Sequence, residues 1–205
     1  MTYSQSPQAN TASTSRSSNA TATDIAYIAV FAAIIMVLGF VAIPAGVFGV
    51  PIVLQNAAVI LAALVLGSRR GFLTTLLFLA VGLAFPVLAG GRTTIAALGG
   101  PTAGYLVGYL IAALVAGAIA YRAPFSANRA VTTGIFIVAG YLGLFMQYLF
   151  GVFGMMLRLD LTFGAAWAAQ LPFLLPDAIK VAVMIAIALA VHTAFPDLRG
   201  KLGKR

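Results

Sequence analysis

The stretch FLLPDAIKVAVMIAIALAV, residues 173–191, places an acid and a base three residues apart at the head of an otherwise apolar segment. Lys180 is followed by residues 181–191, none of which has a polar side chain. An apolar run of about 20 residues is long enough to cross the hydrocarbon core of a bilayer as a helix. A transmembrane helix is therefore predicted over 175–195, with Asp177 and Lys180 near one of its ends.

The composition of the whole chain agrees with a membrane location. Of the 205 residues, 62% are hydrophobic and 8% are charged, and the four acids are all Asp. A soluble domain carries about 25% charged residues, so this chain has too little polar surface to stay in solution. The sequence therefore predicts an all-α integral membrane protein that crosses the membrane several times, in the cell (plasma) membrane.

Five further apolar segments reach or approach the length of a membrane span, so a bundle of six transmembrane helices is expected. The six run over 24–43, 52–67, 71–88, 103–121, 130–153 and 175–195. Together they form a membrane domain over 24–197. The Ser- and Thr-rich residues 1–23 are predicted to be a disordered tail, and 198–205 a basic tail. Between the fifth and sixth spans, TFGAAWAAQL (162–171) predicts a short interfacial helix that ends at Pro172.

The basic residues predict how the bundle is oriented. One side carries nine of them: Arg16, Arg69, Arg70, Arg122, Arg129, Arg199, Lys201, Lys204 and Arg205. The loops on the other side contain Arg92 and Arg158. Basic residues accumulate on the cytoplasmic side of membrane proteins, so both tails are expected in the cytoplasm. The net charge of +8 forms no patch interleaved with aromatic residues, which favours the lipid bilayer as a partner and not nucleic acid.

On this topology, Asp177 and Lys180 lie at the outer end of the last helix. Pro176 suits the first helical position, which places Asp177 in the first turn, where the helix dipole favours a carboxylate. Lys180 is disfavoured there by the same dipole, but an ammonium beside a helix N-terminus is a good receptor for an anion. We therefore expect a pocket in which Lys180 meets a substrate carboxylate and Asp177 accepts hydrogen bonds from substrate N–H groups. The alternative is an ion pair that neutralises itself at the interface.

The first outer loop, IPAGVFGVPIVLQN (43–56), contains Pro51 and ends in two amides. Gln55 and Asn56 can donate and accept hydrogen bonds without charge, which suits a polar neutral group on a ligand. The alternative is that they cap the start of a helix.

The third loop, FPVLAGGRTTIAALGGPTAGYLVGY (85–109), contains two glycine pairs. Glycines permit positive φ and close backbone approach, so this segment is expected to fold over a ligand as a lid. The residues expected in the lid are Pro51, Gly90, Gly91, Gly100, Pro101 and Thr102. Arg92 beside the first pair either steers an anion into the pocket or lies at the lipid headgroups.

Small residues four apart indicate faces where helices approach closely in lipid. Gly104 and Gly108 belong to such a row in the fourth predicted helix, where packing within the bundle is expected. Ala29 and Ala33 are also four apart, and either pack inside the bundle or form a smooth face for another protein.

Motifs for catalysis are missing from the sequence. There is no phosphate-binding loop for ATP hydrolysis and no H-E-x-x-H or G-x-S-x-G motif. The single His192 is expected at the membrane interface, and no metal site, cofactor or enzymatic activity is predicted. An outward-facing pocket without an energy source requires either a partner that supplies the energy or passive exchange.

Four strings resemble motifs of the BioY family, the biotin-binding substrate components of energy-coupling-factor transporters. They are VPIVLQN (50–56), FPVLAGG (85–91), GPTAGYLVGY (100–109) and LPFLLPDAIK (171–180). In addition, AVFAA (29–33) resembles the A-x-x-x-A element on the first helix of such components.

The resemblance implies a biotin pocket at the outer face, partly closed by the first loop. It implies site roles for Gln55, Tyr105, Asp177 and Lys180. It also implies that Ala29 and Ala33 meet a transmembrane coupling subunit, which works with two ATPase subunits. The expected function is biotin capture for an ATP-driven vitamin importer. Two alternatives stay open: a passive carrier of biotin or of another carboxylate-bearing vitamin, and an assembly subunit without a ligand.

Overall fold

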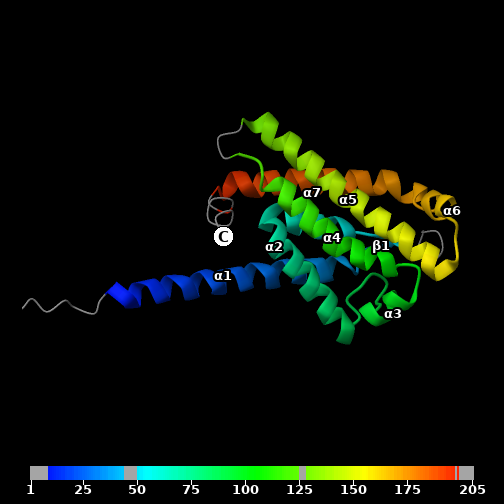
Figure 1. Cartoon of the computed structure of the whole chain (residues 1–205), viewed down its shortest axis with the longest axis horizontal. Helices are drawn as coiled ribbons and strands as arrows, with labels where there is room; N and C mark the ends of the chain where they lie inside the picture. Colours follow the sequence, from blue (N-terminus) through cyan, green and yellow to red (C-terminus); the bar gives the residue numbers. More distant parts are fainter. Residues whose placement is uncertain (1–8, 44–49, 125–127, 197, 199–205) are drawn as a thin grey trace, which may run out of the picture.

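The computed structural model describes residues 9–43, 50–124, 128–196 and 198, and it folds this part of the chain into seven helices and one short β-hairpin (Figure 1). The elements are α1 (Ala9–Leu38), β1 (Ala42–Ile43), β2 (Ile52–Val53), α2 (Gln55–Ala84), α3 (Thr94–Gly99), α4 (Ala103–Ala120), α5 (Arg129–Leu159), α6 (Phe163–Ala168) and α7 (Leu171–Ala194). The strands are antiparallel, with Ala42 opposite Val53 and Ile43 opposite Ile52. An all-α fold with several membrane-length helices was predicted and is observed.

Helix α2 has 30 residues and reverses direction at Gly67. Gly67 has φ 82° and ψ 177°, a conformation that is open to glycine and strained for other residues. Gln55, the first residue of α2, donates a hydrogen bond to the carbonyl of Val87, which lies beyond its last residue. The two ends of a straight helix of this length would be about 45 Å apart. Helix α2 therefore consists of two antiparallel arms, 55–66 and 68–84.

Five of the described helices are long and apolar enough to cross a membrane, namely α2, α4, α5, α7 and the part of α1 from Thr21 to Leu38. The sequence predicted six separate spans because it treated 52–67 and 71–88 as independent helices. The difference lies in α2, whose two arms correspond to these segments and meet at Gly67 with no loop between them.

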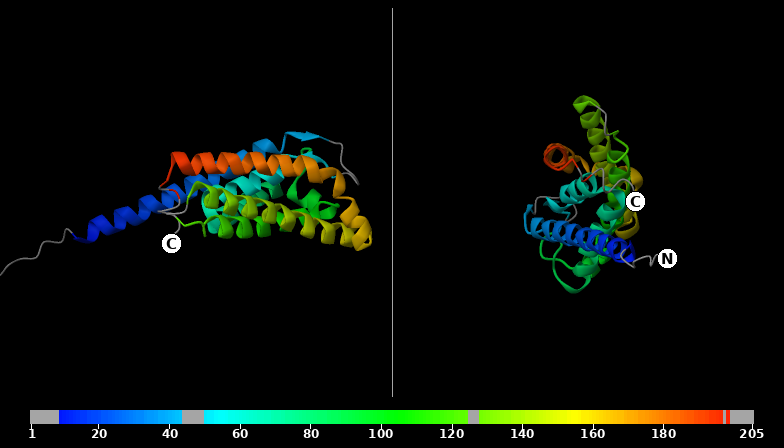
Figure 2. Two further views of the ribbon diagram at one scale, coloured as in Figure 1. Left: turned by 90° about the horizontal axis from the view of Figure 1, so that it is seen from above. Right: turned by 90° about the vertical axis from the view of Figure 1, so that its left-hand side faces the viewer.

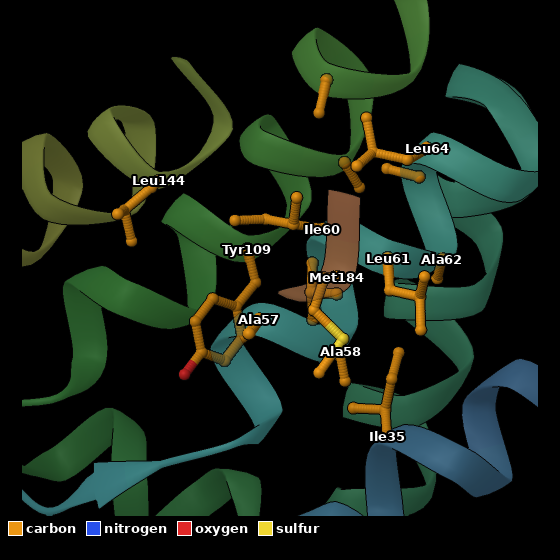
Figure 3. Packing of buried hydrophobic residues seen from close by; sticks show 14 of the residues in the cluster. Ile35, Ala57, Ala58, Ile60, Leu61, Ala62, Leu64, Tyr109, Leu144 and Met184 are labelled. Carbon is orange, nitrogen blue, oxygen red and sulfur yellow. The ribbon is translucent and has the colours of Figure 1, made fainter. Parts of the chain in front are cut away.

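The first arm of α2 is the centre of the bundle, since every residue from Gln55 to Gly67 is buried. Figure 3 shows it surrounded by side chains of the other long helices, namely Ile35 (α1), Tyr109 (α4), Leu144 (α5) and Met184 (α7). Lipid tails are as apolar as these side chains, so close packing is what holds the helices together.

The closest helix packing occurs between α4 and α5. A Cβ on Gly104 would lie 2.0 Å from the carbonyl oxygen of Phe150, and one on Gly108 would lie 2.9 Å from the Cα of Gln147. The row of small residues predicted on this helix therefore packs inside the molecule.

Helix α1 begins at Ala9, whereas the sequence predicted a disordered tail up to residue 23. No Pro or Gly lies between Ala9 and Leu38. The helix therefore extends toward the N-terminus from its apolar part, because adding a residue to an existing helix is far easier than nucleating one. Residues 1–8 and 199–205, which belong to the predicted tails, lie outside the described residues.

Helix α7 begins at Leu171, four residues before the predicted start. Pro172 occupies the first turn, and Pro176 lies inside the helix. The prediction that Pro176 is the first helical residue and that Asp177 lies in the first turn was wrong, because the first of the two prolines starts the helix. The short helix α6 lies within the segment predicted for it, and the side chain of Thr162 caps its N-terminus by accepting a hydrogen bond from Ala165 N.

The bundle has two distinct ends. Helix α1 begins and α7 ends toward one end, while β1, α3 and α6 lie at the other (Figure 1). The two further views agree with this arrangement, and they show α1 projecting past the other helices (Figure 2). The end that carries the β-hairpin and α3 is the end that contains the site described next.

Candidate ligand-binding site

A cavity of about 610 Å³, part of it open to solvent, lies at the β-hairpin end of the bundle. It is lined by Val50, Pro51, Ile52, Val53, Gln55, Asn56, Leu88, Ala89, Arg92, Thr102, Tyr105, Leu106, Tyr109, Gln147, Tyr148, Phe173 and Asp177. The wall is mainly aliphatic and aromatic, with a few polar groups among them.

Asp177 supplies a carboxylate to this cavity from the second turn of α7. Its side chain is 4% exposed, and Oδ2 accepts a hydrogen bond of 2.8 Å from the hydroxyl of Tyr148. Its Oδ1 is ion-paired with the ammonium of Lys180. The ammonium and the hydroxyl thus give this buried carboxylate the partners that offset its lost hydration.

Lys180 does not line the cavity. Besides the ion pair with Asp177, its Nζ donates to the carbonyl of Val53, at 2.5 Å, and to Oδ1 of Asn56, at 3.2 Å. An ammonium has three N–H donors, and these three acceptors use all of them. Lys180 therefore connects α7 to β2 and to the start of α2, and has no donor left for a ligand.

Arg92 is the basic residue that lines the cavity. The chain turns back between Leu88 and Arg92, which form an isolated antiparallel bridge. The guanidinium donates from Nε to the carbonyl of Ala89, at 3.2 Å, and from Nη1 to the hydroxyl of Thr102, at 3.4 Å. Among the described residues it has no carboxylate partner. Because a guanidinium has five donors, Arg92 retains donors and a full positive charge for an anion.

Gln55 has a structural role that its position in the sequence did not reveal. Its amide donates to the carbonyls of Ile35, at 3.1 Å, and Val87, at 2.7 Å, and its Oε1 accepts from Ala89 N at 3.0 Å. The side chain, 2% exposed, thus joins α1, α2 and the segment that carries Arg92. Both of its N–H groups are used within the protein.

Two buried glutamines were not predicted, one that lines the cavity and one that contacts a lining residue. Gln147 of α5 donates to the carbonyl of Asn56, at 3.0 Å, while its Oε1 has no hydrogen-bond partner in the described part of the chain. Gln170 accepts a hydrogen bond from the hydroxyl of Tyr105 at 2.5 Å. A buried acceptor without a donor is costly, so Gln147 Oε1 is a natural contact for a ligand N–H. The sequence signal that could have identified Gln147 is its position as a polar residue within the otherwise apolar span 130–153.

The residues predicted as a lid have different conformations. Gly90 and Gly91 have φ of 72° and 70°, the left-handed turn for which glycine is favoured, and nothing lies within 4 Å of a Cβ on either. Gly100, in contrast, is extended, and precedes Pro101 and Thr102 at the start of α4. Pro51 and Thr102 line the cavity, and the part of the first loop over 44–49 lies outside the described residues.

Ala29 and Ala33 lie away from this cavity, on α1. Both are exposed, together with the neighbouring Val30, Ile34 and Val37. The alternative that these alanines pack inside the bundle is therefore wrong, and they form part of an apolar outer face.

The structure thus describes a bundle of membrane-length helices with a largely apolar cavity, to which Arg92 brings a guanidinium and Asp177 a buried carboxylate. The chain is a member of the BioY family, whose model matches residues 10–197. This is a family of transporter components and not of enzymes.

Individual relatives agree with this membership. The chain is 41% identical over 185 residues to the "Biotin transporter BioY" of Rhodobacter capsulatus, covering 85% of this chain and 95% of that protein. It is 35% identical over 179 residues to the protein of the same description from Rhizobium etli, covering 85% and 96% of the two chains. Its fold is similar to a crystal structure of the S-component for biotin from an ECF-type ABC transporter, with a TM-score of 0.76, 26% identity, and coverage of 85% and 93%.

Proposed function

We propose that this chain captures biotin at the outer face of the cell membrane, as the substrate-binding subunit of an ATP-driven importer. The observation that carries the proposal is the cavity, in which Arg92 and Asp177 lie on separate elements with apolar walls around them. Biotin has a carboxylate on an apolar tail and a neutral urea with N–H donors, so its two polar parts match these two groups. Relatives described as biotin transporters support the choice of ligand.

The proposed topology has six crossings, with each arm of α2 counted as one. Both termini then lie in the cytoplasm, and the β-hairpin end of the bundle faces outward. The reversal of α2, the end of α4 and the start of α5 lie at the opposite end of the bundle from the β-hairpin (Figure 1). These segments contain or adjoin Arg69, Arg70, Arg122 and Arg129, so the positive-inside rule supports this orientation.

Arg92 is the proposed partner of the biotin carboxylate. Lys180 was expected to have this role, but its three donors are used by Asp177, Val53 and Asn56, whereas the guanidinium of Arg92 has donors to spare. A guanidinium also binds a carboxylate through two parallel hydrogen bonds.

The urea end of biotin is assigned to Asp177 and Gln147, whose oxygens accept from its N–H groups. Asn56 and Tyr105 also line the cavity and are proposed as further contacts. Gln55 and Lys180 act as positioning residues, because they hold Arg92 and Asp177 in place without a donor left for the ligand.

Pro51, Gly90, Gly91, Gly100, Pro101 and Thr102 are proposed to form the covering over the cavity. The β-hairpin brings Pro51 to one side and the start of α4 brings Thr102 to the other. No atom lies within 4 Å of a Cβ at Gly90 or Gly91, so the turn that contains these two glycines can move without displacing a side chain.

The exposed face of α1 around Ala29 and Ala33 is the proposed contact with a transmembrane coupling subunit, which joins two ATPase subunits. Small residues permit close approach of a partner helix in lipid. The similar crystal structure, described as part of an ECF-type ABC transporter, supports this partnership.

The test of this function compares proteoliposomes that contain the chain alone with proteoliposomes that also contain its coupling module and ATP. We expect the chain alone to bind labelled biotin at the membrane without moving it inside, and accumulation to require the module and ATP. Equilibration of biotin across the membrane by the chain alone would instead support the passive carrier.

A further inference from the structure

A second cavity lies at the other end of the bundle, where α1 passes the reversal of α2. It is partly open to solvent and is lined from within 21–28 of α1, 66–73 of α2 and 117–121 of α4. These segments are far from the β-hairpin that borders the biotin cavity (Figure 1). The proposed capture of biotin does not use this space.

Two arginines, Arg69 and Arg70, line the cavity, and its one carboxylate, Asp24, is paired with Arg70. The guanidinium of Arg70, 8% exposed, donates to Oδ1 of Asp24 at 2.5 Å. Its Nε is buried and has no acceptor among the described residues. Arg69 is exposed beside it, and no ion pair to Arg69 is formed within the described part of the chain. The cavity therefore has an excess of positive charge and guanidinium donors that are not saturated.

The remainder of the wall is apolar on the side of α1. Ile25, which is 61% exposed, and Ile28 line the cavity together with Leu73 of α2. A free phosphate ion would match the arginines and leave this apolar wall in contact with water. A molecule with an anionic headgroup and hydrocarbon chains satisfies both parts of the site.

We propose that this cavity binds an anionic phospholipid, with Arg69 and Arg70 at its phosphate and with its acyl chains along Ile25 and Ile28. Basic pockets between transmembrane helices on the cytoplasmic side are suited to such headgroups. The lipid joins α1 to the turn of α2, so it braces the helix that carries Ala29 and Ala33.

The proposal is tested by native mass spectrometry of the full chain, released from detergent containing phosphatidylglycerol, cardiolipin or phosphatidylcholine. We expect retention of the two anionic lipids and not of phosphatidylcholine. Arg69→Gln and Arg70→Gln should each lower this retention about five-fold, the effect of one basic side chain near a lipid surface. Arg129→Gln, which removes an exposed arginine outside the cavity, should leave it unchanged.

The Asp24→Asn variant should change lipid retention in a direction that damage to the fold would not produce. It removes the carboxylate that competes with the lipid for Arg70, so retention should rise. Biotin binding, measured on the same preparations, should be unchanged in all four variants and shows that each is folded. A failure of biotin to bind the unaltered chain would contradict the proposed function and leave the lipid result standing.

Three outcomes would overturn the lipid proposal. The first is equal retention of phosphatidylglycerol in Arg69→Gln, Arg70→Gln and Arg129→Gln. The second is full displacement of the lipid by inorganic phosphate at equal concentration, which would identify a site for the free ion. The third is loss of assembly with the coupling subunit in the arginine variants while lipid retention stays constant, which would assign the cavity to that protein.

Discussion

At the scale of single residues, the ion pair of Asp177 and Lys180 is the feature of the sequence that led to the site. The structure places the two residues differently from the expectation. Asp177 faces the cavity, whereas Lys180 holds the carboxylate, β2 and Asn56 together. The spacing showed that the charges belong together, but it did not show which one lines the cavity, because that depends on where β2 lies against α7.

Separate removal of these charges should destabilise the protein more than their joint removal. Lys180→Met leaves the buried carboxylate of Asp177 without its cation, and Asp177→Asn leaves the partly buried ammonium of Lys180 without its carboxylate. Loss of one member of a buried pair costs about 3–5 kcal/mol, while replacement of both is close to neutral. We expect a low apparent melting temperature for each single variant and a value near that of the parent chain for the double variant. If the double variant loses the sum of the two single effects, the pair has no such coupling.

Other site residues could not be predicted from their neighbours in the sequence. Gln147 and Tyr148 lie within a long apolar span, and their contacts with Asn56 and Asp177 join helices that are far apart in the chain. Gln55 was predicted as a ligand contact, yet its three hydrogen bonds join α1, α2 and the segment that carries Arg92. Long-range pairing of this kind depends on the packing of the helices and leaves no local pattern.

At the scale of elements, hydropathy predicted where helices occur better than where they begin. The apolar run and the two prolines located α7, but the start moved from 175 to Leu171 because Pro172 takes the first turn. The arms of α2 were predicted as two segments, and Gly67 joins them without a loop. A turn of one residue cannot be separated from a helix by composition alone.

The α4–α5 contact should tolerate no side chain at Gly104. A Cβ there would lie 2.0 Å from the carbonyl oxygen of Phe150, so Gly104→Ala must push the two backbones apart. Forcing extra atoms into a packed contact costs about 1–3 kcal/mol, and we expect a lower melting temperature.

Gly134→Ala on α5 is the matched control. No atom lies within 4 Å of its Cβ, and alanine favours a helix by about 1 kcal/mol over glycine. Equal effects of the two substitutions would contradict the packing argument.

At the scale of the whole molecule, the cavity and the proposed coupling face occupy different surfaces. The cavity lies at the β-hairpin end, whereas Ala29 and Ala33 lie on the exposed face of α1. This separation suits a subunit that binds its ligand on one side and receives energy from a partner through another.

A bulkier face on α1 should therefore stop transport without affecting capture. Ala29→Leu combined with Ala33→Leu prevents close approach of a partner helix, so ATP-dependent biotin uptake by cells that contain the coupling module should fall at least about ten-fold. The affinity of the purified double variant for biotin should equal that of the parent chain. Ala186→Leu, at an exposed position of α7, tests whether bulk added elsewhere on the bundle has the same effect. Weaker biotin binding in the double variant would show that this face is not separate from the site.

The most direct test of the account is calorimetric titration of the purified full chain with biotin and with biotin methyl ester. We expect biotin to bind in a 1:1 ratio, and the ester, which lacks the carboxylate charge, to bind at least about ten-fold more weakly because a charge-assisted hydrogen bond is lost. In Arg92→Gln the two ligands should bind with equal, reduced affinity, while Arg129→Gln should behave as the parent chain. Absence of biotin binding by folded protein, or an unchanged preference for biotin over the ester in Arg92→Gln, would contradict the account.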